Sequence, residues 1–154
     1  MYYLPWWMQW AQAIALIFLS SVGAWIAVKQ MRIATAKLNL DLYDRRFKVF
    51  EAGRHFLGQF LVYGTIRLQE ITELSVGTAD AVFLFGDEVV EYLDTLRKTG
   101  VSLNGKNGRL NNMDNNDPGR NAVIDQIAIL ETQLSDEIPR ITSLFKPYLE
   151  LGNI

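Results

Sequence analysis

A run of 22 residues without a charged side chain or a histidine constrains this chain more than any other feature. Residues 7–28 read WMQWAQAIALIFLSSVGAWIAV. As an α-helix that rises about 1.5 Å per residue, the run is roughly 33 Å long, which is close to the ~30 Å hydrocarbon core of a bilayer. It therefore predicts one transmembrane helix to which the rest of the chain is attached.

Two other interpretations of this run stay open. A cleaved signal peptide needs a basic segment in front of its apolar stretch, and residues 1–6 contain no Lys or Arg, although residues 22–24 (Val-Gly-Ala) resemble a weak cleavage site. A helix buried in a soluble protein rarely extends over 20 uncharged residues. Trp6, Trp7 and Trp10 gather at one end of the run, as aromatic residues do at a membrane interface. The transmembrane helix is therefore favoured.

The flanking charges predict the orientation of the span. Basic residues follow it directly: Lys29, Arg32, Lys37, Arg45, Arg46 and Lys48. Because Lys and Arg accumulate on the cytoplasmic side of a membrane, we expect the N-terminus outside and the C-terminal part in the cytoplasm. The predicted domains are a transmembrane anchor over residues 1–28 and a cytoplasmic helical domain over residues 29–154.

Charge and residue types exclude several kinds of site. Residues 29–70 contain eight Lys or Arg and four Asp or Glu, whereas residues 71–154 contain seven and thirteen. An acidic distal domain argues against nucleic acid as a partner. The chain has no Cys and one His, so cysteine-ligated and histidine-rich metal sites are excluded together with disulfides.

The pattern after the run is helical throughout. Apolar residues recur at intervals of three and four, as on one helix face: Ile33, Ala36, Leu40, Tyr43, Phe47 and Phe50. A second stripe follows Leu38, Leu42, Val49, Phe56 and Phe60, so this helix is expected to lie between neighbours. No strand-like alternation is present. The predicted fold class is all-α, with the membrane helix continuing into a bundle of three or four helices.

The remaining helix boundaries are predicted from turn and capping residues. Residues 73–80 (ELSVGTAD) resemble a connector, with Thr78 as the N-cap of a helix over residues 79–99 and Gly100 just after its end. The Asn/Gly-rich residues 104–119 predict a surface loop. A last helix is expected to begin with Asp117 and Pro118, and Pro139 should kink or split it.

Two sets of residues are candidate contacts. Five basic residues beside the predicted membrane could bind lipid headgroups or a partner protein: Lys29, Arg32, Lys37, Arg45 and Arg46. Within the span, a face of small residues could allow self-association: Ser20, Gly23, Ala24 and Ala27. The ordinary interpretation of the first set is a positive flank, and of the second the usual composition of a membrane helix.

No stretch predicts catalysis or a cofactor. Asp114, Asn116, Gly119 and Asp125 have part of the spacing of a calcium loop, but Pro118 takes a ligand position and an Asp stands where the bidentate Glu is needed. The single His55 lies beside Glu51 on a charged face, which is typical of a solvated helix surface. We therefore expect no enzymatic activity, no metal and no cofactor.

Three strings carry a resemblance to a known family. KLNLDLYDRRFKVFEA, FLFGDEVVEYLDTLRK and LFKPYLEL together resemble an uncharacterised family of small bacterial single-pass membrane proteins with a KLxLDLxDRRFxVxEA-like motif after the span. The resemblance covers most of residues 29–151. It implies a bacterial inner-membrane protein with an all-helical cytoplasmic region, and it implies no catalytic residues.

Two functions are compatible with this sequence. In the first, the chain is a membrane-anchored interaction or scaffold protein that presents its bundle to an unidentified protein partner, with homo-oligomers possible. In the second, it is an oligomerising membrane effector of the toxin or phage-defence type that perturbs the bilayer. The absence of site chemistry favours the first function.

Overall fold

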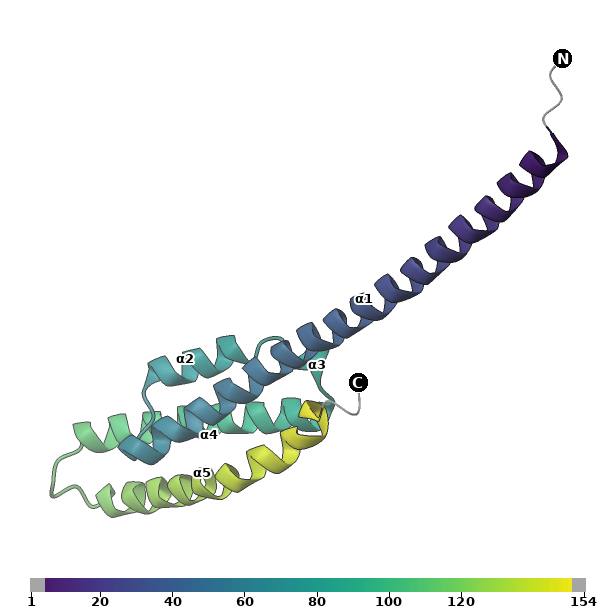
Figure 1. Cartoon of the computed structure of the whole chain (residues 1–154). Coiled ribbons are helices and arrows are strands. Elements are labelled where there is room, and N and C mark those ends of the chain that lie inside the picture. Colours follow the sequence, from purple (N-terminus) through teal and green to yellow (C-terminus); the bar gives the residue numbers. More distant parts are fainter. Residues whose placement is uncertain (1–4, 151–154) are drawn as a thin grey trace. The chain divides into compact units, whose positions relative to one another are not determined.

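The structure is a computed structural model that describes residues 5–150; within its first helix, the side chains of residues 6, 7, 9, 11–15 and 17 lie outside the described part. All regular structure in this range is helical, which confirms the all-α part of the predicted fold class (Figure 1). The elements are α1 (Trp6–Tyr63), α2 (Leu68–Gly77), the single turn α3 (Ala81–Leu84), α4 (Asp87–Asn112) and α5 (Arg120–Leu149).

The chain divides into two compact units, one up to Asp41 and one from Leu42 onward. The first unit is α-helical from Trp6, and the backbone stays helical through Tyr63, as the helical pattern after residue 28 predicted. From Phe18 to Leu38 every side chain of this unit is exposed. The described side chains of the first unit therefore form no core.

The second unit is a bundle with one apolar core. Its fully buried side chains come from four helices and the turn after α1; the largest are Phe56, Ile66, Leu74, Leu96, Leu103, Leu134 and Phe145. Helix α4 packs along α5 and also against α2 and α3. Figure 1 shows α4 and α5 side by side over most of their length.

Three glycines allow the other helices to approach α1 closely. A Cβ on Gly53 of α1 would lie 2.9 Å from Ile141 of α5 and 3.4 Å from Leu93 of α4. A Cβ on Gly77 of α2 would lie 2.7 Å from the Cβ of Ala52. A Cβ on Gly100 of α4 would lie 2.7 Å from the ring of Phe56. The α1 segment of the second unit is thus surrounded on several sides, as its two apolar stripes predicted. The same stripes fail in the first unit, where Ile33, Leu38 and Leu40 are exposed.

The predicted connector at residues 73–80 is wrong. Helix α1 ends at Tyr63 because Gly64 takes φ +63°, a left-handed conformation that glycine adopts without strain. A new helix, α2, starts at Leu68, and Glu70 accepts a hydrogen bond from the backbone N–H of Arg67 in front of it. Thr78 is not an N-cap: its hydroxyl donates to the carbonyl of Leu74 at the end of α2.

The predicted end of a helix at Gly100 and the predicted loop from residue 104 are also wrong. Helix α4 begins at Asp87, after the short turn α3, and runs without a break to Asn112. Leu103 is fully buried within it. The amide of Asn104 donates to the carbonyl of Ile66 at 2.8 Å, and that of Asn107 donates to the hydroxyl of Thr65 at 3.2 Å. These contacts keep the Asn/Gly-rich segment helical as far as Asn112, and the loop is confined to residues 113–119.

Helix α5 begins slightly later than predicted and passes through both of its prolines. Its N-cap is Gly119, while Asp117 accepts a hydrogen bond from the N–H of Gly119 in the preceding turn. Pro139 and Pro147 lie inside the helix, so of the two outcomes predicted for Pro139, a kink or a split, the split is wrong. Figure 1 shows α5 as an unbroken, curved ribbon. The helix stays packed in the core on both sides of Pro139, where Leu134 and Ile141 are buried, although Pro139 removes one backbone hydrogen bond.

Candidate functional site

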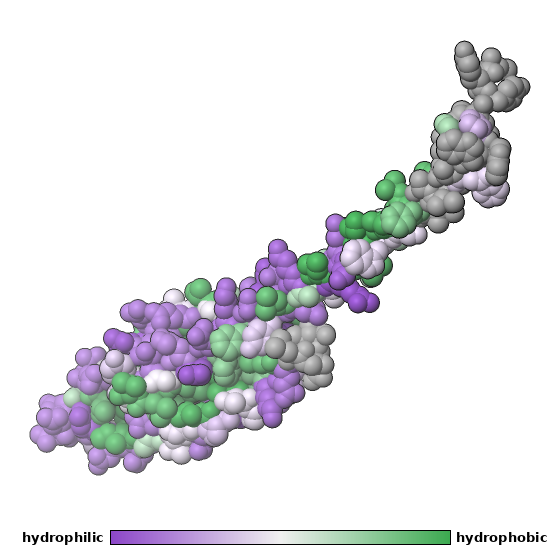
Figure 2. Space-filling view, viewed as in Figure 1, coloured by the Kyte–Doolittle hydropathy of each residue, from purple (hydrophilic) through white to green (hydrophobic). Residues whose placement is uncertain are grey.

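The predicted membrane-facing residues lie on an exposed helix. Trp10, Leu16, Phe18, Leu19 and Trp25 are each 64–71% exposed, as is Met31 just after the predicted span. Figure 2 shows hydrophobic side chains along this part of α1. The hydroxyls of Ser20 and Thr35 donate to the carbonyls of Leu16 and Met31 on their own helix, so these polar groups are satisfied locally. The surface of this segment is therefore largely apolar.

Among the residues that the structure describes, no helix is long and apolar enough to cross a membrane. The predicted span includes residues 7, 9, 11–15 and 17, whose side chains lie outside the described residues, as does that of Trp6 in the predicted aromatic belt. The transmembrane helix is therefore not supported by the structure and stays a prediction from the sequence.

The predicted small face lies on this exposed helix. Ser20, Gly23, Ala24 and Ala27 are all exposed, and a Cβ on Gly23 would meet nothing within 4 Å. Room for larger side chains thus exists at this face, and a substitution there tests self-association without disturbing the fold.

The five predicted basic contacts divide into two kinds. Lys29, Arg32, Lys37 and Arg45 are exposed. The ammonium group of Lys29 lies 5.3 Å from the ring centroid of Trp25, a cation–π distance. These four side chains are available to an anionic surface.

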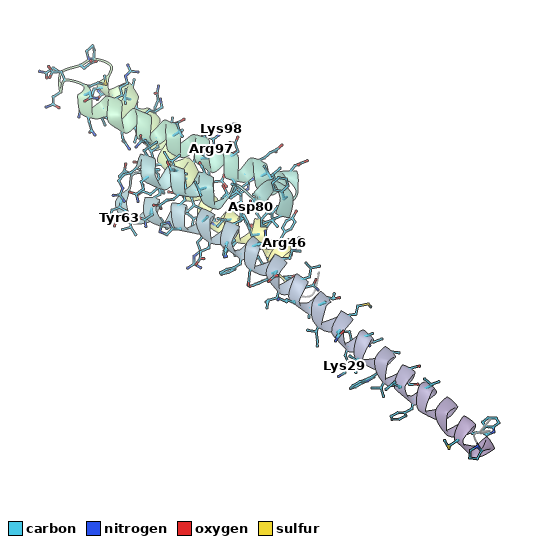
Figure 3. All side chains as sticks on the ribbon, turned by 90° about the horizontal axis from the view of Figure 1, so that it is seen from above. Lys29, Arg46, Tyr63, Asp80, Arg97 and Lys98 are labelled. Carbon is cyan, nitrogen blue, oxygen red and sulfur yellow. The ribbon has the colours of Figure 1, made fainter. Side chains whose placement is uncertain are left out.

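Arg46, in contrast, binds within the second unit (Figure 3). Its Nε donates to the carbonyl of Leu84 at 3.2 Å, and one Nη donates to the carbonyl of Tyr148 at 3.4 Å. Its guanidinium group also lies 5.8 Å from the Tyr148 ring centroid. Since both carbonyls belong to the C-terminal ends of helices, Arg46 joins α1 to the ends of α3 and α5.

A charged groove of about 310 Å³ lies between α1 and α2. Its walls carry Lys48, Glu51, His55, Glu70 and Glu73 above an apolar floor of Ala52, Phe56 and Leu74. Glu70 is only 5% exposed, and both of its carboxylate oxygens accept hydrogen bonds from Arg67, one from the backbone N–H and one from Nε. Burial alone would raise the pKa of Glu70, but the hydrogen bonds and charge of Arg67 outweigh burial and hold that pKa below its usual value.

A mainly apolar groove of about 280 Å³ lies between α1 and α5, and we call it the α1/α5 groove. It is lined by Leu57, Gly58 and Leu61 of α1, by Ile138, Ile141 and Thr142 of α5, and by Arg54 at its polar side. A Cβ on Gly58 would meet nothing within 4 Å, so the glycine leaves space in the groove. Neither groove was predicted, because each requires residues from two helices whose pairing the sequence does not show.

No group of three or more His, Cys, Asp and Glu side chains in the described part of the chain is arranged to hold a metal ion. In the segment that resembles a calcium loop, a carboxylate oxygen of Asp117 accepts the N–H of Gly119 at 2.7 Å. Tyr92 is buried and donates to the carbonyl of Glu137 at 3.0 Å; burial, followed by the nearby Glu137, raises its pKa far above the usual value. Its hydroxyl is therefore a structural donor at physiological pH.

Comparison of the chain with protein-family models, with curated proteins and with solved structures finds no match.

Proposed function

We propose that this chain is a membrane-anchored helical interaction protein without catalytic activity. Residues 7–28 hold it in a bacterial inner membrane, and the bundle in the cytoplasm binds a protein partner. The exposed helix that carries Phe18, Leu19, Trp25 and Ile26 supports the anchor, because no described residue covers these large apolar side chains. A helix that is apolar on most of its circumference is typical of a span.

The basic residues support the same orientation. Lys29, Arg32, Lys37 and Arg45 remain exposed after the apolar run, where anionic headgroups would attract each of them by roughly 1 kcal/mol. Arg46 is not part of this contact, because it binds helix ends within the bundle.

Topology fusions test the anchor and its orientation. A fluorescent protein fused after the bundle should fluoresce in the membrane fraction, and alkaline phosphatase at the same position should be inactive. Active phosphatase would overturn the orientation. Recovery of the chain in the soluble fraction, without membrane, would overturn the anchor itself.

A second experiment separates an anchor from a membrane effector. Gly23→Ile fits sterically, because nothing lies within 4 Å of an added Cβ. We expect induction of the unmodified chain and of this variant to leave the membrane potential unchanged, as measured with a potential-sensitive dye. If the unmodified chain depolarises the membrane and Gly23→Ile abolishes this effect, the chain is a membrane effector and the proposed interaction protein is wrong.

A further inference from the structure

The turn α3 presents two apolar side chains that the bundle leaves uncovered. Phe83 is 84% exposed, the highest value among the described large hydrophobic side chains, and the preceding Val82 is 59% exposed. We call these two residues the α3 tip. Ala81 is buried, and Leu84 and Phe85 are partly buried against the core, so Val82 and Phe83 are the exposed apolar side chains of this turn.

The α3 tip is held in place on both sides. The N–H of Phe83 donates to the carbonyl of Asp80, and the N–H of Phe85 donates to that of Ala81, both at 3.0 Å. Arg46 binds the carbonyl of Leu84, and the Phe85 ring lies 5.1 Å from that of Phe145. Because these contacts already fix the backbone of the turn, it loses little conformational freedom on binding, which favours docking.

The α1/α5 groove has the size and the charge to receive this tip. Its volume of about 280 Å³ is below the roughly 300–1,000 Å³ of small-molecule pockets and is sufficient for an aromatic side chain. Leu57, Leu61 and Ile138 would contact the ring, and the open position at Gly58 would admit it. A buried aromatic anchor in an apolar pocket is the usual centre of a protein interface.

The charges beside the two surfaces are complementary. Asp80 precedes the α3 tip (Figure 3), and Asp87 and Glu88 follow it. Arg54 lines the groove. None of these four side chains forms an ion pair with a residue that the structure describes, so each is available to a partner of opposite charge.

We infer that the α3 tip of one copy docks into the α1/α5 groove of a second copy of this chain, with Asp80 of one facing Arg54 of the other. This inference deepens the proposed function, because it names one partner of the bundle. It uses residues of the second unit alone, so failure of the topology or membrane-potential experiments would leave it untouched. Because the tip and the groove are different surfaces, successive copies joined by this contact either close into a ring or extend into an open filament.

Disulfide trapping tests the contact directly, since the chain contains no cysteine. Full-length Phe83→Cys and Leu61→Cys chains with different tags are mixed in a mild non-ionic detergent and oxidised. We expect a mixed disulfide well above the level given by Val76→Cys with Leu61→Cys, because Val76 is 72% exposed and lies outside the tip. Equal yields in the two mixtures would overturn the contact.

Groove filling and charge reversal test the same contact without cysteines. Gly58→Leu should abolish self-association in light scattering, and Gly105→Leu, at another helical glycine with nothing within 4 Å of a Cβ, should not. Phe83→Ala should raise the dissociation constant by roughly 30-fold, as loss of an anchor residue does. Arg54→Glu and Asp80→Lys should each weaken association and together restore it. An unmodified chain that stays monomeric, or association that survives Gly58→Leu, would overturn the inference.

Discussion

At the scale of single residues, glycines contribute more by the space they leave than by their flexibility. Gly100 lies inside α4, where the Phe56 ring occupies the place that a Cβ would take. Phe56 itself is 1% exposed and cannot move aside easily. Gly105 lies in the same helix with open space around it. The two positions therefore form a matched pair.

Replacing these glycines by alanine should have opposite effects on stability. Gly105→Ala should stabilise the bundle by up to about 1 kcal/mol, because alanine is the better helix former. Gly100→Ala brings the same gain in helix propensity but should destabilise the bundle by roughly 1–3 kcal/mol, because the added methyl group overpacks the contact with Phe56. Urea unfolding followed by circular dichroism measures both changes. Equal stabilisation by both substitutions would mean that α4 and α1 are further apart than described.

Glu70 links the stability of the bundle to pH. Arg67 holds the pKa of this carboxyl group below its usual value in the folded state, so the folded protein favours the charged form. The stabilisation is complete above the ordinary pKa of about 4.5 and is lost as the pH falls through the lower folded pKa. Glu70→Gln should lower the Tm by roughly 2–5 °C at pH 7 and by much less near pH 3.

The control for this prediction is Glu73→Gln on the same helix. Glu73 is exposed and accepts a hydrogen bond from the exposed Gln69. Its replacement should change the Tm little at either pH. If Glu70→Gln lowered the Tm equally at pH 7 and pH 3, the charge of Glu70 would not be the cause.

At the scale of elements, helix ends in this bundle are fixed by contacts between helices. Arg46 of α1 binds a carbonyl at the end of α3 and another near the end of α5. Asn104 of α4 likewise satisfies the carbonyl of the fully buried Ile66 in the turn after α1. A buried carbonyl without a partner costs roughly 1–3 kcal/mol, so such contacts decide where helices can end.

Arg46→Met should loosen the two helix ends that Arg46 joins. The substitution keeps much of the apolar stem and removes the hydrogen bonds to Leu84 and Tyr148. We expect a loss of about 1–3 kcal/mol in stability and faster amide exchange at residues 83–86 and 145–149. The neighbouring Arg45→Met serves as the control, because Arg45 is exposed. Exchange that rises equally in both variants would show that the Arg46 contacts do not hold these ends.

At the scale of the whole molecule, the buried core belongs to the second unit. Every buried side chain in the described part of the chain belongs to residues 49–145. The first unit contributes a helix, and none of its described side chains belongs to the core. Folding stability and the proposed attachment to a membrane therefore reside in different parts of the chain.

A fragment of residues 42–154 should fold by itself. We expect a cooperative thermal transition with a Tm within about 5 °C of the full-length chain, because the fragment keeps all described core residues. Circular dichroism against temperature measures this. A broad, non-cooperative transition would mean that residues before 42 contribute to the stability of the bundle.

Local sequence patterns were sufficient for the helical class, the long first helix and a last helix whose start was predicted to within a few residues. These features depend on apolar spacing, proline and charge along one segment, and each of those acts within a few residues. The exposure of Lys29, Arg32 and Lys37 agrees with their place in a charged flank, while their role as contacts stays a prediction. The span itself stays a prediction from composition.

Only the tertiary structure decided which local signals were overruled. Gly100 and the Asn/Gly-rich residues 104–112 normally end a helix, but Leu103 buries its side chain and Asn104 finds a carbonyl on another segment, so α4 continues. Arg46 has the same sequence signal as Arg45, yet it binds helix ends while Arg45 is exposed. The α3 tip and the α1/α5 groove likewise depend on pairing between distant segments. Contacts between residues far apart in the chain outweigh local propensities of about 1 kcal/mol, and a single sequence does not show which contacts form.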